Sequence, residues 1–162
     1  MKADFEAISS EIITHQEYLK LTNEIHHGIT RYEHSLRVAK STYRIAKALK
    51  LDYVSATRAA LLHDFFVNDD VAEYKVLGKG INHPKQAVVN AKAHFGINAK
   101  EENAIITHMF PLTLKMPSTK EGIIVNLADT GVGIYECSKY KLSMTASIWM
   151  LFIINIITFK MN

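Results

Sequence analysis

The chain has 162 residues, of which 48% are apolar, and it carries a formal net charge of +3. This length and composition are typical of one ordinary domain with its own core. Lys and Arg exceed Asp and Glu by only 19 to 16, so a polycationic, nucleic-acid-binding tract is excluded. Because Cys137 is the one cysteine and charges interrupt the apolar runs of the first twenty residues, we expect no disulfide framework, no export signal and a cytoplasmic location.

Apolar residues recur at helical spacing along most of the chain, and only three prolines and seven glycines interrupt the pattern. The pattern predicts an all-α fold, a single bundle of about six to seven helices. In chain order, the expected helices cover residues 4–25, 31–50, 53–66, 84–95, 99–109 and 119–138. The longest expected loop covers residues 67–82.

Polar residues mark the expected helix starts. Three pairs match the capping box, in which a side chain caps the helix and a glutamate three residues later bonds back; they are Thr30 with Glu33, Asn98 with Glu101, and Ser118 with Glu121. Pro84 is a residue type favoured just inside a helix start, which predicts that His83 lies at the mouth of its helix.

The segment 142–159 contains no charged residue and is bounded by Lys141 and Lys160. As a helix it would be about 27 Å long, close to the minimum for crossing a bilayer. We therefore divide the chain into a domain at 1–141 and an apolar C-terminal helix at 142–162. Burial of this helix, within the fold or in a homodimer, is favoured over a membrane anchor because Ser, Thr and Asn dilute it.

Four ionisable residues fall on otherwise apolar helices. His34 lies in RYEHSLRVA, His63 and Asp64 lie in LLHDFF, and Asp129 lies in VNLADTG. A polar side chain on the core-facing side of a helix is costly unless it is paired or coordinates a metal, and four of them together favour a metal. Imidazole and carboxylate ligands without thiolates indicate a catalytic rather than a structural site.

The order His, then His-Asp, then Asp resembles the HD superfamily of phosphohydrolases, an all-helical fold, over residues 25–137. The resemblance implies that the first metal is held by His34, His63, Asp64 and Asp129. His83 in INHPKQA and His108 in IITHMFPLT fall where binuclear members have further ligands, which implies a second metal with Asp64 bridging the two. The pattern is most similar to the binuclear branch that includes the YqeK-type dinucleoside-tetraphosphate hydrolases.

This resemblance implies a hydrolase for a phosphomonoester or phosphoanhydride, with a nucleotide expected, that acts through a metal-bridging hydroxide. The expected cofactor is two divalent transition-metal ions, Fe or Mn before Co, Ni or Zn. Asp64 is a candidate catalytic residue, and Arg37, one turn beyond His34, is the candidate phosphate-binding cation. A solvated surface arginine is the alternative for Arg37.

Two other functions are compatible with the same ligand set. Some HD proteins are di-iron oxygenases that cleave bonds with dioxygen, and a metal can also stabilise a non-catalytic regulatory module. The expected partner is a small anionic phosphorylated substrate, with a homodimer as a further possibility and no nucleic acid.

Overall fold

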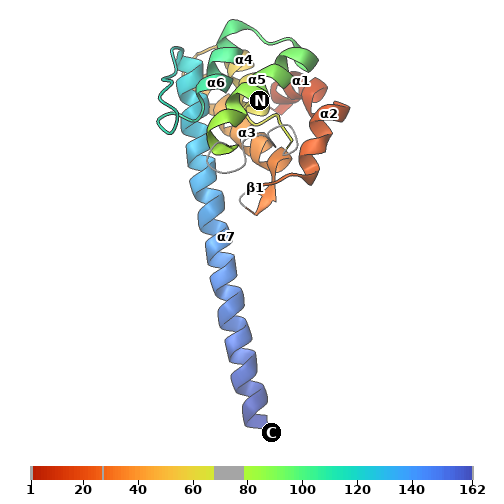
Figure 1. The fold of residues 1–162 in the computed structure, drawn as a ribbon, viewed down its shortest axis with the longest axis vertical. Coiled ribbons are helices and arrows are strands. Elements are labelled where there is room, and N and C mark those ends of the chain that lie inside the picture. Colours follow the sequence, from red (N-terminus) through yellow and green to blue (C-terminus); the bar gives the residue numbers. More distant parts are fainter. Residues whose placement is uncertain (1, 27, 68–78, 162) are drawn as a thin grey trace.

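The computed structural model describes the backbone of residues 2–26, 28–67 and 79–161, and the side chains of 4–25, 28–67, 83–145 and 150. The elements follow in the order α1 (Lys2–Ile13), α2 (Gln16–Leu19), the 3-10 turn η1 (Lys20–Asn23), β1 (Ile25–His26), β2 (Ile29–Thr30), α3 (Arg31–Ala48), α4 (Tyr53–Leu62), α5 (Lys79–Phe95), α6 (Ala99–Thr107) and α7 (Lys120–Met161) (Figure 1). The predicted all-α class is confirmed.

The first predicted helix is wrong as a single element, because the chain turns after Ile13. His15 caps the next helix with its own ring, whose Nδ1 accepts from the backbone N–H of Glu17. This local side-chain bond competes with continuation of the helix. The short hairpin of β1 and β2 follows, paired antiparallel.

The tip of this hairpin lies against α7. Gly28 has a φ of 84°, and a Cβ there would come within 2.5 Å of the Tyr140 ring. Only glycine meets both conditions without strain. The backbone N–H of Arg31 donates to the carbonyl of Glu24 (2.7 Å), which closes the base of the hairpin directly before α3.

Two of the three predicted capping boxes are confirmed, at Thr30 and at Asn98. The third is wrong by one residue: Thr119 caps α7 by accepting from the N–H of Gly122. Glu121 instead accepts from the backbone N–H of Asp52 across the bundle (3.1 Å). A tertiary partner has replaced the local one.

His83 does not lie at a helix mouth, because α5 begins at Lys79 and contains Pro84. The missing N–H of a proline near a helix start removes only one backbone bond, so the helix can extend past it. His83 therefore lies on the helix itself, where its direction is set by the position of α5.

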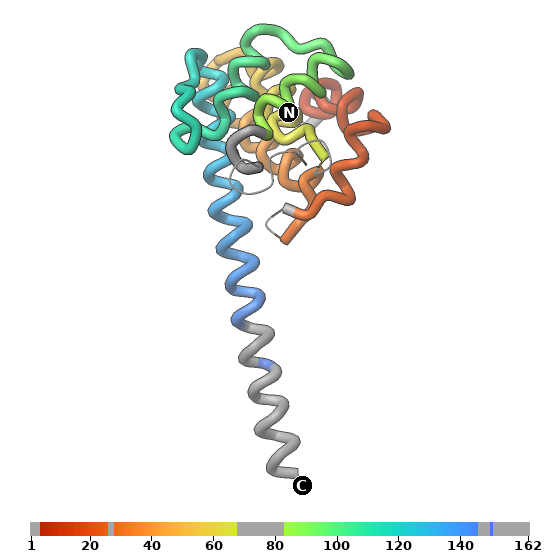
Figure 2. The backbone as a smooth tube through the Cα atoms, in the orientation of Figure 1, coloured from red at the N-terminus to blue at the C-terminus, as the bar shows by residue number. Residues whose placement is uncertain are grey.

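Helices α3, α4 and α7 pack against one another, α6 packs on α4 and α7, α1 packs on α4, and α5 packs on α6. Figure 2 shows α3 (orange) and the first half of α7 (blue) side by side through the bundle. The interior is formed by small and aliphatic residues such as Val38, Ala59, Leu61, Ile105 and Val125. The alanines of this core, such as Ala59 and Ala104, leave room for neighbouring helices to approach closely.

No break separates the predicted helix 119–138 from the apolar segment 142–159, because α7 runs without interruption to Met161. Leu142 and Met150 are 73% and 61% exposed, so neither side chain is buried within the fold of one chain, and burial of this segment in a homodimer stays a prediction. The side chains at 146–149 and 151–159 lie outside the described residues. Within the described part of the chain, no helix combines the length and apolarity needed to cross a membrane.

Candidate metal centre

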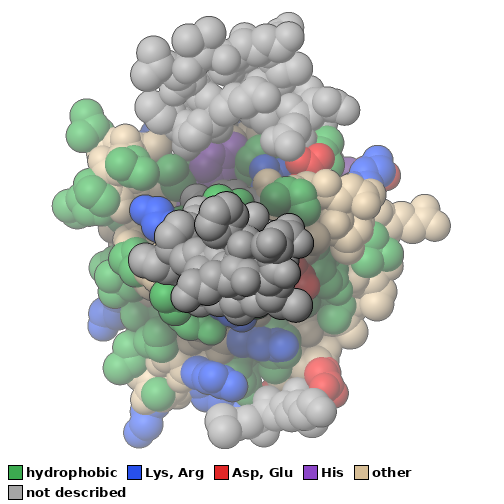
Figure 3. All heavy atoms as spheres, turned by 90° about the horizontal axis from the view of Figure 1, so that it is seen from below, with side chains coloured by type: hydrophobic (Ala, Val, Ile, Leu, Met, Phe, Trp, Pro, Cys, Tyr) green, Lys and Arg blue, Asp and Glu red, His purple; other side chains and the backbone are tan. Residues whose placement is uncertain are grey.

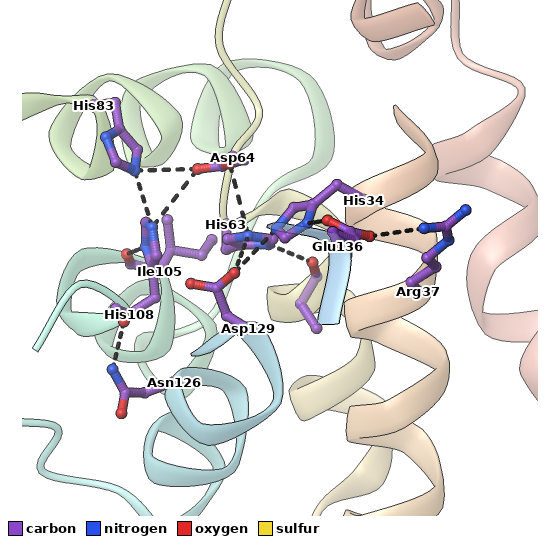
Figure 4. Close-up of polar contacts among 11 residues, drawn as sticks. His34, Arg37, His63, Asp64, His83, Ile105, His108, Asn126, Asp129 and Glu136 are labelled. Atoms are coloured by element: carbon purple, nitrogen blue, oxygen red, sulfur yellow. Dashed lines mark hydrogen bonds and ion pairs between the residues drawn. The ribbon is translucent and has the colours of Figure 1, made fainter. Parts of the chain in front are cut away.

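The six predicted ligands come from five helices or their ends and lie together inside the bundle (Figure 4). His34 lies on α3, His83 on α5 and Asp129 on α7, while His63 and Asp64 follow α4 and His108 follows α6. Five of the six residues are buried, and the Asp129 side chain is 18% exposed.

His63 and His108 are placed by the same device at two helix ends. Each is the first residue beyond its helix, and each Nδ1–H donates to the carbonyl three residues before it, Ala60 or Ile105, at 2.7 Å. In the neutral form of each ring this bond places the proton on Nδ1, so Nε2 is the nitrogen that can bind a ligand. The side chain of Asn126 donates to the backbone carbonyl of His108.

His34 is held between two carboxylates of α7. Its Nδ1 donates to Glu136 Oε2 (2.8 Å), and its Nε2 lies 3.0 Å from Asp129 Oδ1. A carboxylate behind a histidine fixes the orientation of the ring and raises its basicity, as in many metal sites. The same Asp129 oxygen lies 3.5 Å from His63 Nε2, so one carboxylate faces two imidazoles.

Asp64 lies between the two ends of the cluster. Its Oδ2 is 3.8 Å from His63 Nε2, and its Oδ1 is 3.1 Å from His83 Nε2 and 3.6 Å from His108 Nε2. The Nε2 atoms of His83 and His108 are 2.9 Å apart. Several donor atoms therefore surround one small volume.

The donor set fits a divalent metal. Among the residues that the structure describes, three overlapping groups of side chains have ligand atoms within 4.8 Å of one another; they are His34 with His63 and Asp64, His63 with His108 and Asp129, and Asp64 with His83 and His108. His63 Nε2 and Asp64 Oδ1 are fully buried and form no hydrogen bond; their contacts are ion pairs, with Asp129 at 3.5 Å and with His83 at 3.1 Å. Buried polar atoms that lack a hydrogen bond are costly, and a cation at this position would satisfy both.

Burial and the neighbouring charges shift the pKa values of the same side chains. Burial alone would raise the carboxyl pKa values, but His63 holds the pKa of Asp64, and His34 that of Asp129, well below the ordinary range. Burial and the nearby His63 lower the pKa of His108 to about 4, so this ring is neutral near pH 7. Burial opposes the charge on His63, yet Asp64 and Asp129 raise its pKa to about 9. A cation at His63 Nε2 must therefore displace a proton.

A model of the HD domain matches residues 31–130, well over half of the chain. The chain belongs to the HD-domain family. Members of this superfamily are typically metal-dependent hydrolases. No curated protein and no solved structure matched the chain.

The structure adds one carboxylate to the HD site that the sequence interpretation missed. Glu136 is 3% exposed and contacts both His34 and Arg37, whose Nη1 lies 3.1 Å from Glu136 Oε1. The signal was its spacing from Asp129, since seven residues are two helical turns and place both carboxylates on one face. Arg37 lies on the side of Glu136 away from Asp64, with 39% of its side chain exposed (Figure 4).

Proposed function

We propose that this HD domain is a phosphohydrolase for a phosphomonoester or phosphoanhydride, with a nucleotide as the substrate class. The observation that carries the proposal is the position of Asp64, which belongs to two of the three ligand groups and directs one oxygen to His63 and the other to His83. A carboxylate with this arrangement can join two cations. We assign the first to His34, His63, Asp64 and Asp129, and the second to Asp64, His83 and His108.

Two divalent ions bound here would supply an activated water molecule and would neutralise charge on the phosphoryl oxygens. The protein's own residues would bind the ions and fix the orientation of the ligand side chains. Backbone carbonyls fix the tautomers of His63 and His108, and the low pKa values of Asp64 and Asp129 keep both carboxylates ionised. Burial excludes bulk water, which strengthens every charge interaction in the site.

Fe or Mn is the expected metal, with Co, Ni or Zn as alternatives, because the donors are imidazoles and carboxylates. The binuclear assignment supports a place in the branch that includes the YqeK-type hydrolases. The basic groups agree with an anionic substrate: in the uncovered part of the face in Figure 3, Lys and Arg side chains are distributed among apolar ones. Arg37 remains our candidate for the phosphate contact, since its side chain is 39% exposed and its guanidinium is held by Glu136, the carboxylate that also contacts His34.

The test is turnover of the purified full chain on a panel of nucleotides and simple phosphate esters, with Mn²⁺ or Fe²⁺ and with or without oxygen. Release of phosphate or of a nucleotide product without oxygen is the expected result. Turnover only with oxygen would instead indicate an oxygenase, and metal binding without any turnover would indicate a regulatory module. The Asp64→Ala variant is the matched control, because a contaminating phosphatase would leave its rate unchanged.

A further inference from the structure

Arg31 is a buried cation that touches none of the six proposed ligands through a hydrogen bond or ion pair described in the structure. It is the first residue of α3 and is 4% exposed. Its Nη1 donates to the carbonyl of Phe66 (2.6 Å), and its guanidinium carbon lies 3.8 Å from the centre of the Phe66 ring. Glu24 supplies a counter-charge at 3.5 Å. The guanidinium therefore holds Phe66 by its backbone and by its ring at once.

Phe66 in turn lies against one ligand of the proposed second metal. Its ring stacks on the imidazole of His83, with centroids 5.0 Å apart and an interplanar angle of 26°. The His83 Nε2 points to Asp64 Oδ1 and to His108 Nε2, at 3.1 and 2.9 Å. A flat ring on one side of an imidazole restricts its rotation about χ2, so Phe66 limits where Nε2 can lie.

The segment that contains Phe66 also positions the helix that carries His83. Asn90 of α5 donates to the carbonyl of Phe65 (3.0 Å). The backbone N–H of Phe66 donates to the backbone carbonyl of Asp64 (2.8 Å), so Asp64 and Phe66 belong to one tight turn. Movement of this turn would shift Asp64 and His83 together.

We propose that Arg31 and Phe66 are positioning residues for the second metal, and that Arg31 acts on His83 through the ring of Phe66. This inference rests on the proposed function, because it needs a second cation at Asp64, His83 and His108. The positioning role also accounts for a buried charge at Arg31, because a guanidinium without partners in this interior would be destabilising. Its partners are a carbonyl, an aromatic face and Glu24.

The experiment is calorimetric titration of the full chain with Mn²⁺, which gives the number of ions and a dissociation constant for each. Arg31→Met and Phe66→Leu should each weaken the second ion by about 10- to 100-fold, the range seen when groups that orient metal ligands are removed. The first ion should change by less than about threefold, because of its four proposed ligands only Asp64 lies in this turn, and His34, His63 and Asp129 would still hold it. Arg31→Lys, which keeps a cation near the ring, should recover part of the loss.

Arg44→Met is the matched control, since Arg44 lies on the same helix and is exposed. Thermal melts show whether each variant folds, and if Arg31→Met does not, Phe66→Leu decides. Folded variants that bind both ions as tightly as the wild type would overturn the positioning role. If the wild type binds two ions but has no phosphatase turnover, the proposed function is rejected. The positioning role of Arg31 and Phe66 is then still decided by the dissociation constants of the variants. A wild type with a single ion would overturn the inference and the binuclear assignment together.

Discussion

Replacement of Glu136 by glutamine tests how the first metal site is built. Glu136 is almost completely buried, and its two oxygens accept from His34 Nδ1 and Arg37 Nη1 at 2.8 and 3.1 Å. Glutamine has nearly the same shape and can still accept one hydrogen bond, but it lacks the charge. The variant therefore removes the electrostatic support of His34 while preserving the packing.

The size of the effect follows from these contacts. A buried hydrogen bond to a charged group contributes about 1.5–3 kcal/mol, which corresponds to a change of about 10- to 100-fold in a binding constant. Because glutamine keeps a neutral acceptor, Glu136→Gln should weaken the first metal ion about tenfold and Glu136→Leu about a hundredfold. Arg37→Met should have the smaller effect, below about 1 kcal/mol, since 39% of the Arg37 side chain is exposed to solvent.

The assay is competition for Mn²⁺ with a fluorescent chelator at fixed pH and ionic strength. Glu121→Gln is the matched control, because Glu121 is a buried glutamate of the same helix that contacts Asp52 and Lys100. It should lower stability and leave metal affinity unchanged. Equal metal affinities for Glu136→Gln, Glu121→Gln and the wild type would refute the view that Glu136 supports a metal ligand. A rise in KM for Arg37→Met at saturating metal would instead assign Arg37 to the substrate.

Four further outcomes are expected. Asp64→Ala should lose bound metal and turnover together, as measured by elemental analysis and phosphate release; retention of both would contradict the ligand assignment. Combined His83→Ala and His108→Ala should reduce the metal content from two ions to one and the rate by about a hundredfold. Because the pKa of His63 is raised to about 9, its proton is bound at pH 7 and must leave when metal binds, so metal affinity should fall as the pH is lowered; calorimetry in buffers of different ionisation enthalpy should detect the release. Lys50→Gly should raise the free energy of unfolding by about 1 kcal/mol in a denaturant titration, because Lys50 has a φ of 55°, which glycine adopts without strain.

The sequence by itself determined the features that depend on neighbours along the chain. Helical periodicity predicted the all-α class, and the capping boxes at Thr30 and Asn98 form as expected because both partners lie within one turn. The cost of polar groups on apolar helices identified His34 and Asp129 as unusual. Resemblance to the HD family added His83 and His108 to the same set.

The tertiary structure decided which of these residues meet and what supports them. His34 and Glu136 are 102 positions apart, and their contact depends on how α3 and α7 pack, which no local pattern specifies. Glu121 left its expected capping role because Asp52 offers it a partner across the bundle. Likewise, the stacking of Phe66 on His83 exists only because α5 packs near the turn that follows Asp64. Local energies of a few tenths to about 1 kcal/mol shape single helices, but burial of the donors between helices sets the geometry of the site.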